Sequence, residues 1–117
     1  MIKVYHLGNC TTCHRILHEL ELGPGVIYQN IKEESITPEQ IDQMKDMVGS
    51  YEALFSRRAM KYRGWGLHEK TLNEDDYRSY ILEEYTFLKR PVIIVDDEIF
   101  VGNTKKVVQQ AKEAIHR

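Results

Sequence analysis

Cys10 and Cys13 are the only two cysteines of the chain, and Thr11 and Thr12 separate them. The pair lies between a short apolar segment that predicts a strand and a helical pattern that follows it. At the first turn of a helix, unpaired backbone N–H groups and the positive end of the helix dipole lower the pKa of a thiol. Because a thiolate is a nucleophile and half of a reversible disulfide, this spacing indicates nucleophilic or redox chemistry.

Two other interpretations of the cysteine pair stay open. Free cysteines are often small buried hydrophobic residues, although chance core cysteines rarely fall three positions apart at a strand-to-helix turn. A zinc site would need histidine ligands, and His6, His14 and His18 are close in the sequence. Since Cys10, Cys13 and His14 would be crowded into one helical turn, tetrahedral coordination is difficult, and we expect no metal.

The size and charge of the chain limit how many domains it can form and which partners and cellular location are expected. Its 117 residues fit one ordinary domain, and a composition that is 42% hydrophobic can form a core. With 16 Lys and Arg against 18 Asp and Glu, the formal net charge is -2, so we expect no direct contact with nucleic acid or membrane. The sequence shows no signal-peptide pattern and no long apolar run. We therefore expect a cytoplasmic protein and, without an obvious exposed apolar stripe, a monomer.

The first third of the sequence predicts a strand, a helix and a second strand. Apolar residues alternate over residues 2–6, and Gly8-Asn9 ends that strand. Apolar residues recur at helical spacing from Cys13 to Leu22, and a Gly-Pro-Gly sequence follows the helix. The second strand is expected at residues 26–31, parallel to the first and reached by a right-handed crossover.

The middle of the sequence predicts helices. Thr37 precedes a proline, and Gln40 completes a capping box, so a helix should run over residues 38–48. A short helical piece is expected at 51–55, and a basic stretch follows at 57–63. Asn73 should cap a further helix that runs to Tyr85, with Tyr80 and Ile81 facing inward.

The last third predicts a hairpin and a final helix. Residues 92–95 form a continuous apolar run that is typical of a buried strand. Asp96-Asp97 fits a two-residue turn into a strand at 99–101, so these two strands should be antiparallel. The helix that starts after Gly102-Asn103-Thr104 should turn four apolar residues to the core, namely Val107, Val108, Ala111 and Ile115.

The order of elements is therefore βαβ, a helical insertion at about residues 37–86, and ββα. This order predicts an α/β protein with a mixed four-stranded sheet, and it is the order of a thioredoxin-like fold with an insertion. A C-x-x-C after the first strand stands where that fold has its active thiol.

Four segments, in one order along the chain, carry a more specific signal. They are Val4-Tyr5-His6-Leu7-Gly8-Asn9-Cys10-Thr11-Thr12-Cys13, Leu54-Phe55-Ser56-Arg57-Arg58, Lys89-Arg90-Pro91-Val92-Ile93-Ile94-Val95, and Gly102. They resemble the opening, the basic segment, the Arg-Pro-apolar strand and the hairpin end of the ArsC/Spx family. That family includes glutaredoxin-linked arsenate reductases and Spx-type redox regulators. The resemblance implies a single thioredoxin-like domain over residues 1–117.

The resemblance also implies roles for the catalytic residues. Cys10 matches the nucleophile, which in the reductases attacks the arsenic of arsenate, and Cys13 matches the second cysteine of the Spx switch, which resolves an oxidised Cys10. Arg90 and Arg58 match arginines that would lower the pKa of Cys10 and bind a three-oxygen anion. Arg57 is a close rival to Arg58 for this role.

Supporting residues follow from the same comparison. Pro91 would be the cis proline that packs against the thiol, and His6 would tune the thiol electrostatically. Two positions differ from the reductases, which have Asn-Pro where this chain has Leu7-Gly8 and an arginine where it has His14. We therefore expect an altered oxyanion site in which His14 takes the place of the arginine.

Three functions remain open from the sequence. The first is an arsenate-reductase-like thiol oxidoreductase that acts on an oxyanion or an oxidised thiol. It would hold no bound cofactor and would receive electrons from thioredoxin, glutaredoxin or glutathione. The second is an Spx-like regulator that binds the RNA polymerase α subunit and switches when a Cys10-Cys13 disulfide forms. The third is a structural or metal-binding module that retains the fold.

Overall fold

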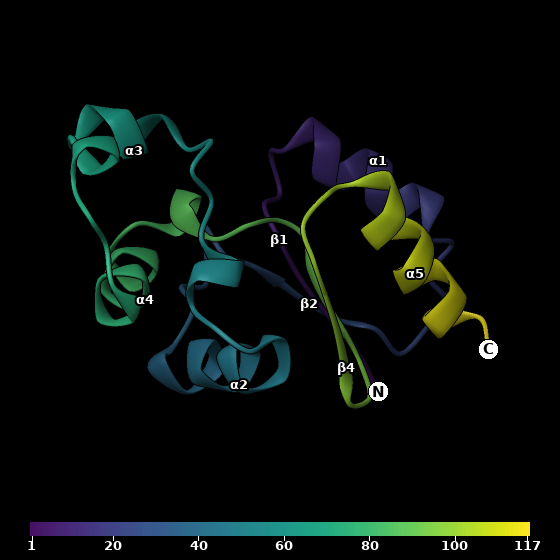
Figure 1. Ribbon diagram of the computed structural model, residues 1–117. Helices are drawn as coiled ribbons and strands as arrows, with labels where there is room; N and C mark the ends of the chain where they lie inside the picture. Colours follow the sequence, from purple (N-terminus) through teal and green to yellow (C-terminus); the bar gives the residue numbers. More distant parts are fainter. The chain divides into compact units, whose positions relative to one another are not determined.

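The computed structural model describes all 117 residues, which form two compact units (Figure 1). Unit 1 consists of Met1–Glu34 and Arg90–Arg117, and unit 2 of Ser35–Lys89. The helical insertion expected at residues 37–86 falls within unit 2, and the single domain stays a prediction. None of the helices is both long and apolar enough to cross a membrane.

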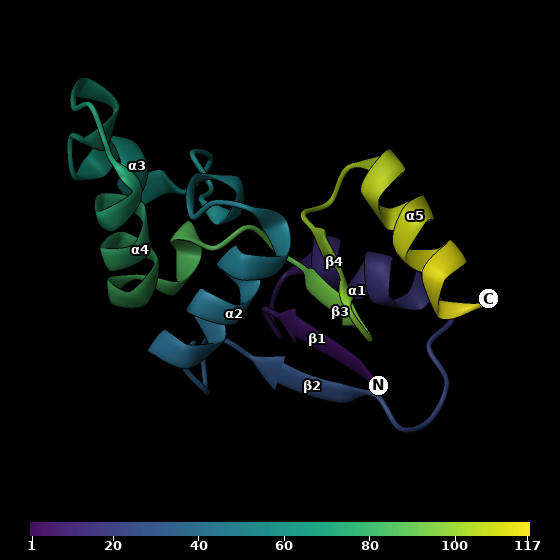
Figure 2. The ribbon, with the colours of Figure 1, turned by 60° about the horizontal axis from the view of Figure 1, so that its bottom comes forward.

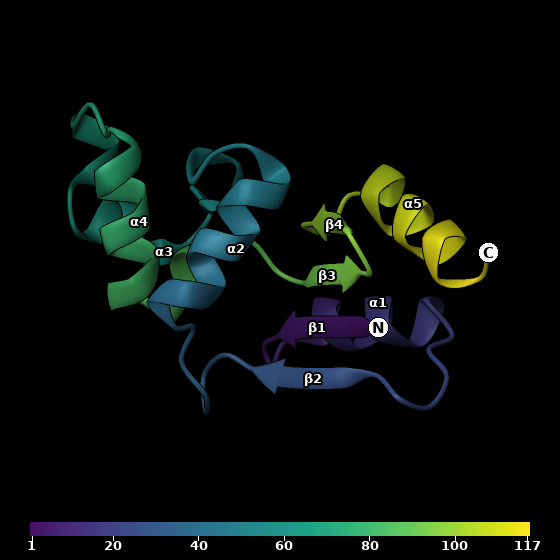
Figure 3. The same cartoon turned by 90° about the horizontal axis from the view of Figure 1, so that it is seen from below.

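Unit 1 is built on a mixed four-stranded sheet with the strand order β2-β1-β3-β4. β1 pairs in parallel with β2 and antiparallel with β3, while β3 and β4 form an antiparallel hairpin (Figure 3). These pairings confirm the predicted βαβ and hairpin arrangement. The strands are β1 (Ile2–His6), β2 (Ile27–Asn30), β3 (Val92–Val95) and β4 (Glu98–Val101).

Two helices, α1 (Thr11–Glu19) and α5 (Lys105–Ile115), pack against the same face of this sheet (Figure 2). Burying one such aliphatic side chain contributes about 1.5–3 kcal/mol, so this layer holds the sheet and both helices together. The buried residues are Val4, Ile16, Leu20, Ile93, Val95, Val108, Ala111 and Ala114. In the last helix, Val107 and Ile115 are half-buried, and Ala114 joins the predicted core residues.

Unit 2 is helical and has an aromatic cluster around Phe55. The ring of Phe55 stacks on Phe87 with a centroid distance of 5.1 Å, and Tyr62 and Tyr77 contact the same ring. Its helices are α2 (Pro38–Val48), α3 (Met60–Gly64) and α4 (Glu74–Glu83), with three short 3-10 helices, η1 (Glu52–Leu54), η2 (Leu67–Glu69) and η3 (Tyr85–Phe87).

Two helices end earlier than the sequence predicts. α1 ends at Glu19 because Glu21 adopts a left-handed φ of 52° and its N–H donates to the carbonyl of His18. α4 ends at Glu83 because Glu84 is extended and its carboxylate accepts from the backbone of η3. On α4 the buried residues are Tyr77 and Ile81, whereas Tyr80, expected to face inward, is only half-buried.

Candidate functional site

The two thiols lie at the start of α1, where the chain leaves β1. Cys10 is the N-cap residue of α1, with extended backbone angles, and its Sγ accepts from the N–H of Cys13 at 3.5 Å. Cys10 is half-buried, Cys13 is 1% exposed, and both thiols are free. A sulfur in the N-cap position takes the place of the side-chain oxygen that usually accepts there.

The surroundings of the two sulfurs shift their pKa values in opposite directions. Burial raises the pKa of Cys10, but the N–H groups of Cys13 and Thr12, the Cys13 thiol and the charge of Arg90 together hold it below the ordinary value. Burial raises the pKa of Cys13 to about 11, and the neighbouring Cys10 sulfur adds to this rise, although the Leu7 backbone and Arg90 oppose it. Of the two thiols, Cys10 is therefore the one that loses its proton more readily.

Arg90 and Pro91 precede β3 in the same unit. The charge of Arg90 lowers the pKa of both thiols, so Arg90 lies within electrostatic range of Cys10 and Cys13. The Arg90-Pro91 peptide bond is cis, as predicted, and Pro91 is buried. Contact between Pro91 and the thiol stays a prediction.

Two of the predicted histidines lie beside residues 7–9, the loop that joins β1 to Cys10. His6 ends β1, and its ring contacts Tyr28 edge to face with centroids 5.9 Å apart. Burial and the nearby His14 lower the pKa of His6, while Glu33 raises it, so the net shift favours the neutral imidazole. His14 is exposed, and its Nε2 contacts the carbonyl oxygen of Gly8. No group of three or more His, Cys, Asp or Glu residues is arranged to hold a metal ion.

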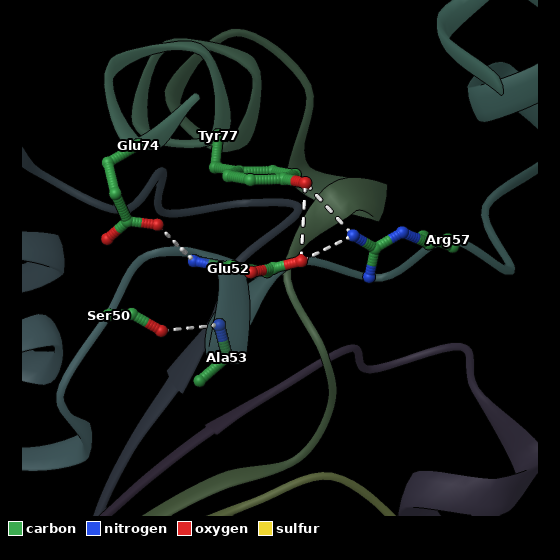
Figure 4. Close-up of polar contacts among 6 residues, drawn as sticks. All are labelled: Ser50, Glu52, Ala53, Arg57, Glu74 and Tyr77. Atoms are coloured by element: carbon green, nitrogen blue, oxygen red, sulfur yellow. Dashed lines mark hydrogen bonds and ion pairs between the residues drawn. The ribbon is translucent and has the colours of Figure 1, made fainter. Parts of the chain in front are cut away.

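Arg57 and Arg58 lie in unit 2, after η1. Arg57 is engaged there, because its Nη2 donates to Glu52 Oε2 at 2.7 Å and to the Tyr77 hydroxyl at 2.9 Å (Figure 4). The Glu52 carboxylate raises the pKa of Arg57 further. The carboxylate of Glu74 in turn accepts from the Glu52 N–H at 3.1 Å, so the segment before Arg57 is fixed as well. Arg58 is exposed, and a part for either arginine in the thiol site stays a prediction.

Gly8 and Asn30 contact the predicted site, although neither was predicted as a site residue from the sequence. Gly8 donates its N–H to Asn30 Oδ1 at 3.2 Å, while its carbonyl oxygen meets His14. A signal for Asn30 was present, since β1 and β2 are parallel and their carboxyl ends must meet at one edge of the sheet. His6 and Asn30 are in fact register partners there.

The sequence and the fold of this chain are similar to those of known proteins. The ArsC family model matches residues 5–111. An arsenate reductase from Vibrio cholerae is 18% identical, with 97% of this chain and 96% of that chain covered and a TM-score of 0.78. A protein from Staphylococcus aureus is 26% identical, with 94% and 97% covered and a TM-score of 0.72.

A third structure extends this likeness. An arsenate reductase (ArsC) related protein from Brucella melitensis is 20% identical, with 93% of this chain and 92% of that chain covered and a TM-score of 0.70. No protein among the curated ones matches the sequence at a significant level. Together with the sheet order, these likenesses confirm the predicted thioredoxin-like α/β fold.

Proposed function

Because this chain belongs to the ArsC family, we propose that it is an arsenate-reductase-like thiol oxidoreductase with Cys10 as its nucleophile and Cys13 as its resolving thiol. One observation carries this proposal. Two free thiols share one helical turn, and their pKa values are shifted apart, lowered for Cys10 and raised to about 11 for Cys13. A pair of this kind has one thiol ready to attack and one that stays protonated until an intermediate has formed.

With arsenate, the reaction has two steps in this proposal. The Cys10 thiolate forms a bond to arsenic and displaces one oxygen, which leaves as hydroxide and is protonated to water. Cys13 then loses its proton and attacks the Cys10 sulfur, and the sulfur–arsenic bond breaks with its electron pair left on arsenic. Arsenic(V) becomes arsenic(III) while two thiols become a disulfide. Thioredoxin, or glutathione with glutaredoxin, supplies two electrons to reduce the disulfide.

An oxidised thiol would follow the same course. The Cys10 thiolate attacks one sulfur of the substrate disulfide and releases the other as a thiolate. Cys13 then attacks the mixed disulfide at Cys10 and releases the second substrate thiol. Both routes end in a Cys10-Cys13 disulfide, so both need the same external reductant.

Two arginines would hold an oxyanion in this proposal. Arg90 is supported by its charge acting on both sulfurs. Arg58 is the better candidate from unit 2, because the guanidinium of Arg57 already meets Glu52 and the Tyr77 hydroxyl. Arginine suits this role since its planar fork of donors matches an oxyanion.

The test is pH-dependent alkylation of Cys10 by iodoacetamide in the reduced Cys13→Ser variant, with arsenate or with chloride at matched ionic strength. We expect a pKa below the free value of about 8.5, and slower alkylation when arsenate is present. Arg90→Gln should raise the pKa of Cys10 and weaken arsenate protection about tenfold, as for one lost charged hydrogen bond. Arg58→Gln should weaken protection similarly, and the matched Arg57→Gln variant should not. A Cys10 pKa equal to that of free cysteine contradicts the proposal.

A redox regulator of the Spx kind is the second candidate. The observation that favours it is Cys13 itself, because a second thiol in the same turn permits a disulfide within one chain. Arsenate turnover with a thiol donor supports the enzyme. Binding of purified RNA polymerase α subunit that changes with oxidation of the pair, with no turnover, supports the regulator.

A further inference from the structure

The loop that leads to the reactive thiol is held by side chains that take no part in the bond-forming and bond-breaking steps proposed above. The loop, residues 7–9, joins β1 to Cys10. The N–H of Cys10 donates to the carbonyl of Leu7 at 3.0 Å, so the loop closes on the backbone of the nucleophile itself. A shift of this loop therefore moves Cys10 with it.

Gly8 is the residue that these side chains contact. Its N–H donates to Asn30 Oδ1 at 3.2 Å, and its carbonyl oxygen meets His14 Nε2. Asn30 is the last residue of β2, and His14 lies near the start of α1, so Gly8 is tied to two different elements. The N–H of Lys32 also donates to Asn30 Oδ1 at 3.2 Å, and this second bond orients the amide.

The approach of Asn30 to the loop depends on the absence of a side chain at position 8. A Cβ atom on Gly8 would lie 2.4 Å from Asn30 Nδ2 and 3.2 Å from its Cγ. Real Cβ contacts are not that short, so the Asn30 amide would have to move. Even alanine at position 8 would force the Asn30 amide to shift.

The contact of His14 with Gly8 needs a proton on Nε2, because a carbonyl oxygen only accepts. That proton is present both in the imidazolium and in one neutral tautomer, so the hydrogen bond does not require a charge on His14. Substitutions at position 14 can therefore separate the effect of the hydrogen bond from the effect of a charge. Glutamine is neutral and carries an amide N–H donor on a side chain of similar reach, whereas alanine is neutral and has no donor.

We propose that His14 and Asn30 are positioning residues for Cys10, because they hold Gly8 from two sides and so keep the Cys10 sulfur at the N–H groups of α1. These N–H groups, from Thr12 and Cys13, are among the causes that lower the pKa of Cys10. The inference rests on the proposed function only in that it takes Cys10 as the reactive thiol.

The test uses iodoacetamide alkylation of Cys10 across a pH series, in the Cys13→Ser background. His14→Ala should raise the pKa of Cys10 and slow alkylation at neutral pH about fivefold, the factor expected for one ordinary hydrogen bond. His14→Gln should keep the parent profile because it restores the donor. His18→Ala is the matched control, since it removes an exposed histidine from the end of the same helix.

Three results would overturn the inference. The first is a His14→Ala profile identical to that of His18→Ala. The second is an equal loss in His14→Ala and His14→Gln, which would assign the effect to charge. The third concerns a second variant, which is used if His14→Ala does not fold. Gly8→Ala shifts the Asn30 amide, which contacts Gly8 opposite His14. An alkylation profile of Cys10 that is unchanged in Gly8→Ala would show that these contacts do not position Cys10. A parent protein with a free-cysteine pKa contradicts the proposed function instead, before any variant is compared.

Discussion

At the scale of single residues, burial gives the Cys13 thiol a pKa far from that of a cysteine in water. It is 1% exposed, and its pKa of about 11 exceeds the free value of about 8.5. Between these two values the unfolded chain releases the thiol proton while the folded chain keeps it. The folded state then binds more protons, so this residue makes stability fall as the pH rises through that window.

We predict that Cys13→Ala weakens this alkaline loss of stability. At pH 8 the variant should be less stable than the parent by about 1 kcal/mol, because a buried sulfur is removed. From pH 8 to pH 10.5 it should lose less stability than the parent, since the thiol that titrates is gone. Urea unfolding of both proteins under reducing conditions at the two pH values measures this. The tyrosines with raised pKa values are the same in both proteins, so their contribution cancels in the comparison. An equal loss of stability in parent and variant would contradict the assignment of this loss to Cys13.

At the scale of elements, local signals explain which segments were predicted well. The helix α2 begins and ends as predicted because Thr37, a following proline and Gln40 specify its start, and Gly49 ends it with a left-handed φ of 108°. The β3–β4 hairpin also agrees, since an apolar run and a two-residue turn lie next to each other in the sequence.

The contacts of the candidate site were less predictable, for a physical reason. Arg57 meets Tyr77, which is 20 residues away, and Gly8 meets Asn30, which is 22 residues away. The parallel strands indicate that Asn30 lies at the same sheet edge as the thiol loop, but the side-chain contacts themselves depend on how the elements pack, which a single sequence does not show. Cys10 and Cys13 could be predicted because they form one short motif, and the cis peptide before Pro91 could be predicted because the segment around it resembles the ArsC/Spx family.

The capping box of α2 gives a test at this scale. Thr37 Oγ1 accepts from the Gln40 N–H at 3.1 Å, and Gln40 Oε1 accepts from the Thr37 N–H at 3.1 Å. Thr37→Ala removes the first bond and should destabilise the protein by about 1 kcal/mol in urea unfolding. Thr37→Ser keeps the hydroxyl and should retain most of the stability. Thr71→Ala, at an exposed position outside the helices, is the control, and an equal effect there would contradict the capping role.

At the scale of the whole molecule, the two units differ in how their chain is arranged. Unit 2 is one continuous segment, whereas unit 1 needs both ends of the chain, because Ile2 of β1 pairs with Val95 of β3. Contacts that are distant in the sequence form more slowly, since a long loop must be closed before they stabilise anything.

We therefore predict that unit 2 gains protection first when the protein refolds. Pulsed hydrogen exchange with mass spectrometry should show amides of α2 and α4 protected before those of β1 and β3. For each segment, the protection measured during refolding is compared with the protection of the same segment in the fully folded protein. Simultaneous protection of all four segments would show that the units fold as one.

The pairing of β1 with β3 also affects how the protein is made. Cys10 and Cys13 are synthesised early, but Arg90 is 77 residues beyond Cys13. At the usual pace of translation, this distance takes roughly 4 to 15 s. Throughout that time the nascent chain has neither the guanidinium that lowers the pKa of Cys10 nor the strand that pairs with β1. The Cys10 thiol therefore reaches the lowered pKa that it has in the folded protein only after Arg90 has been added and β3 can pair with β1.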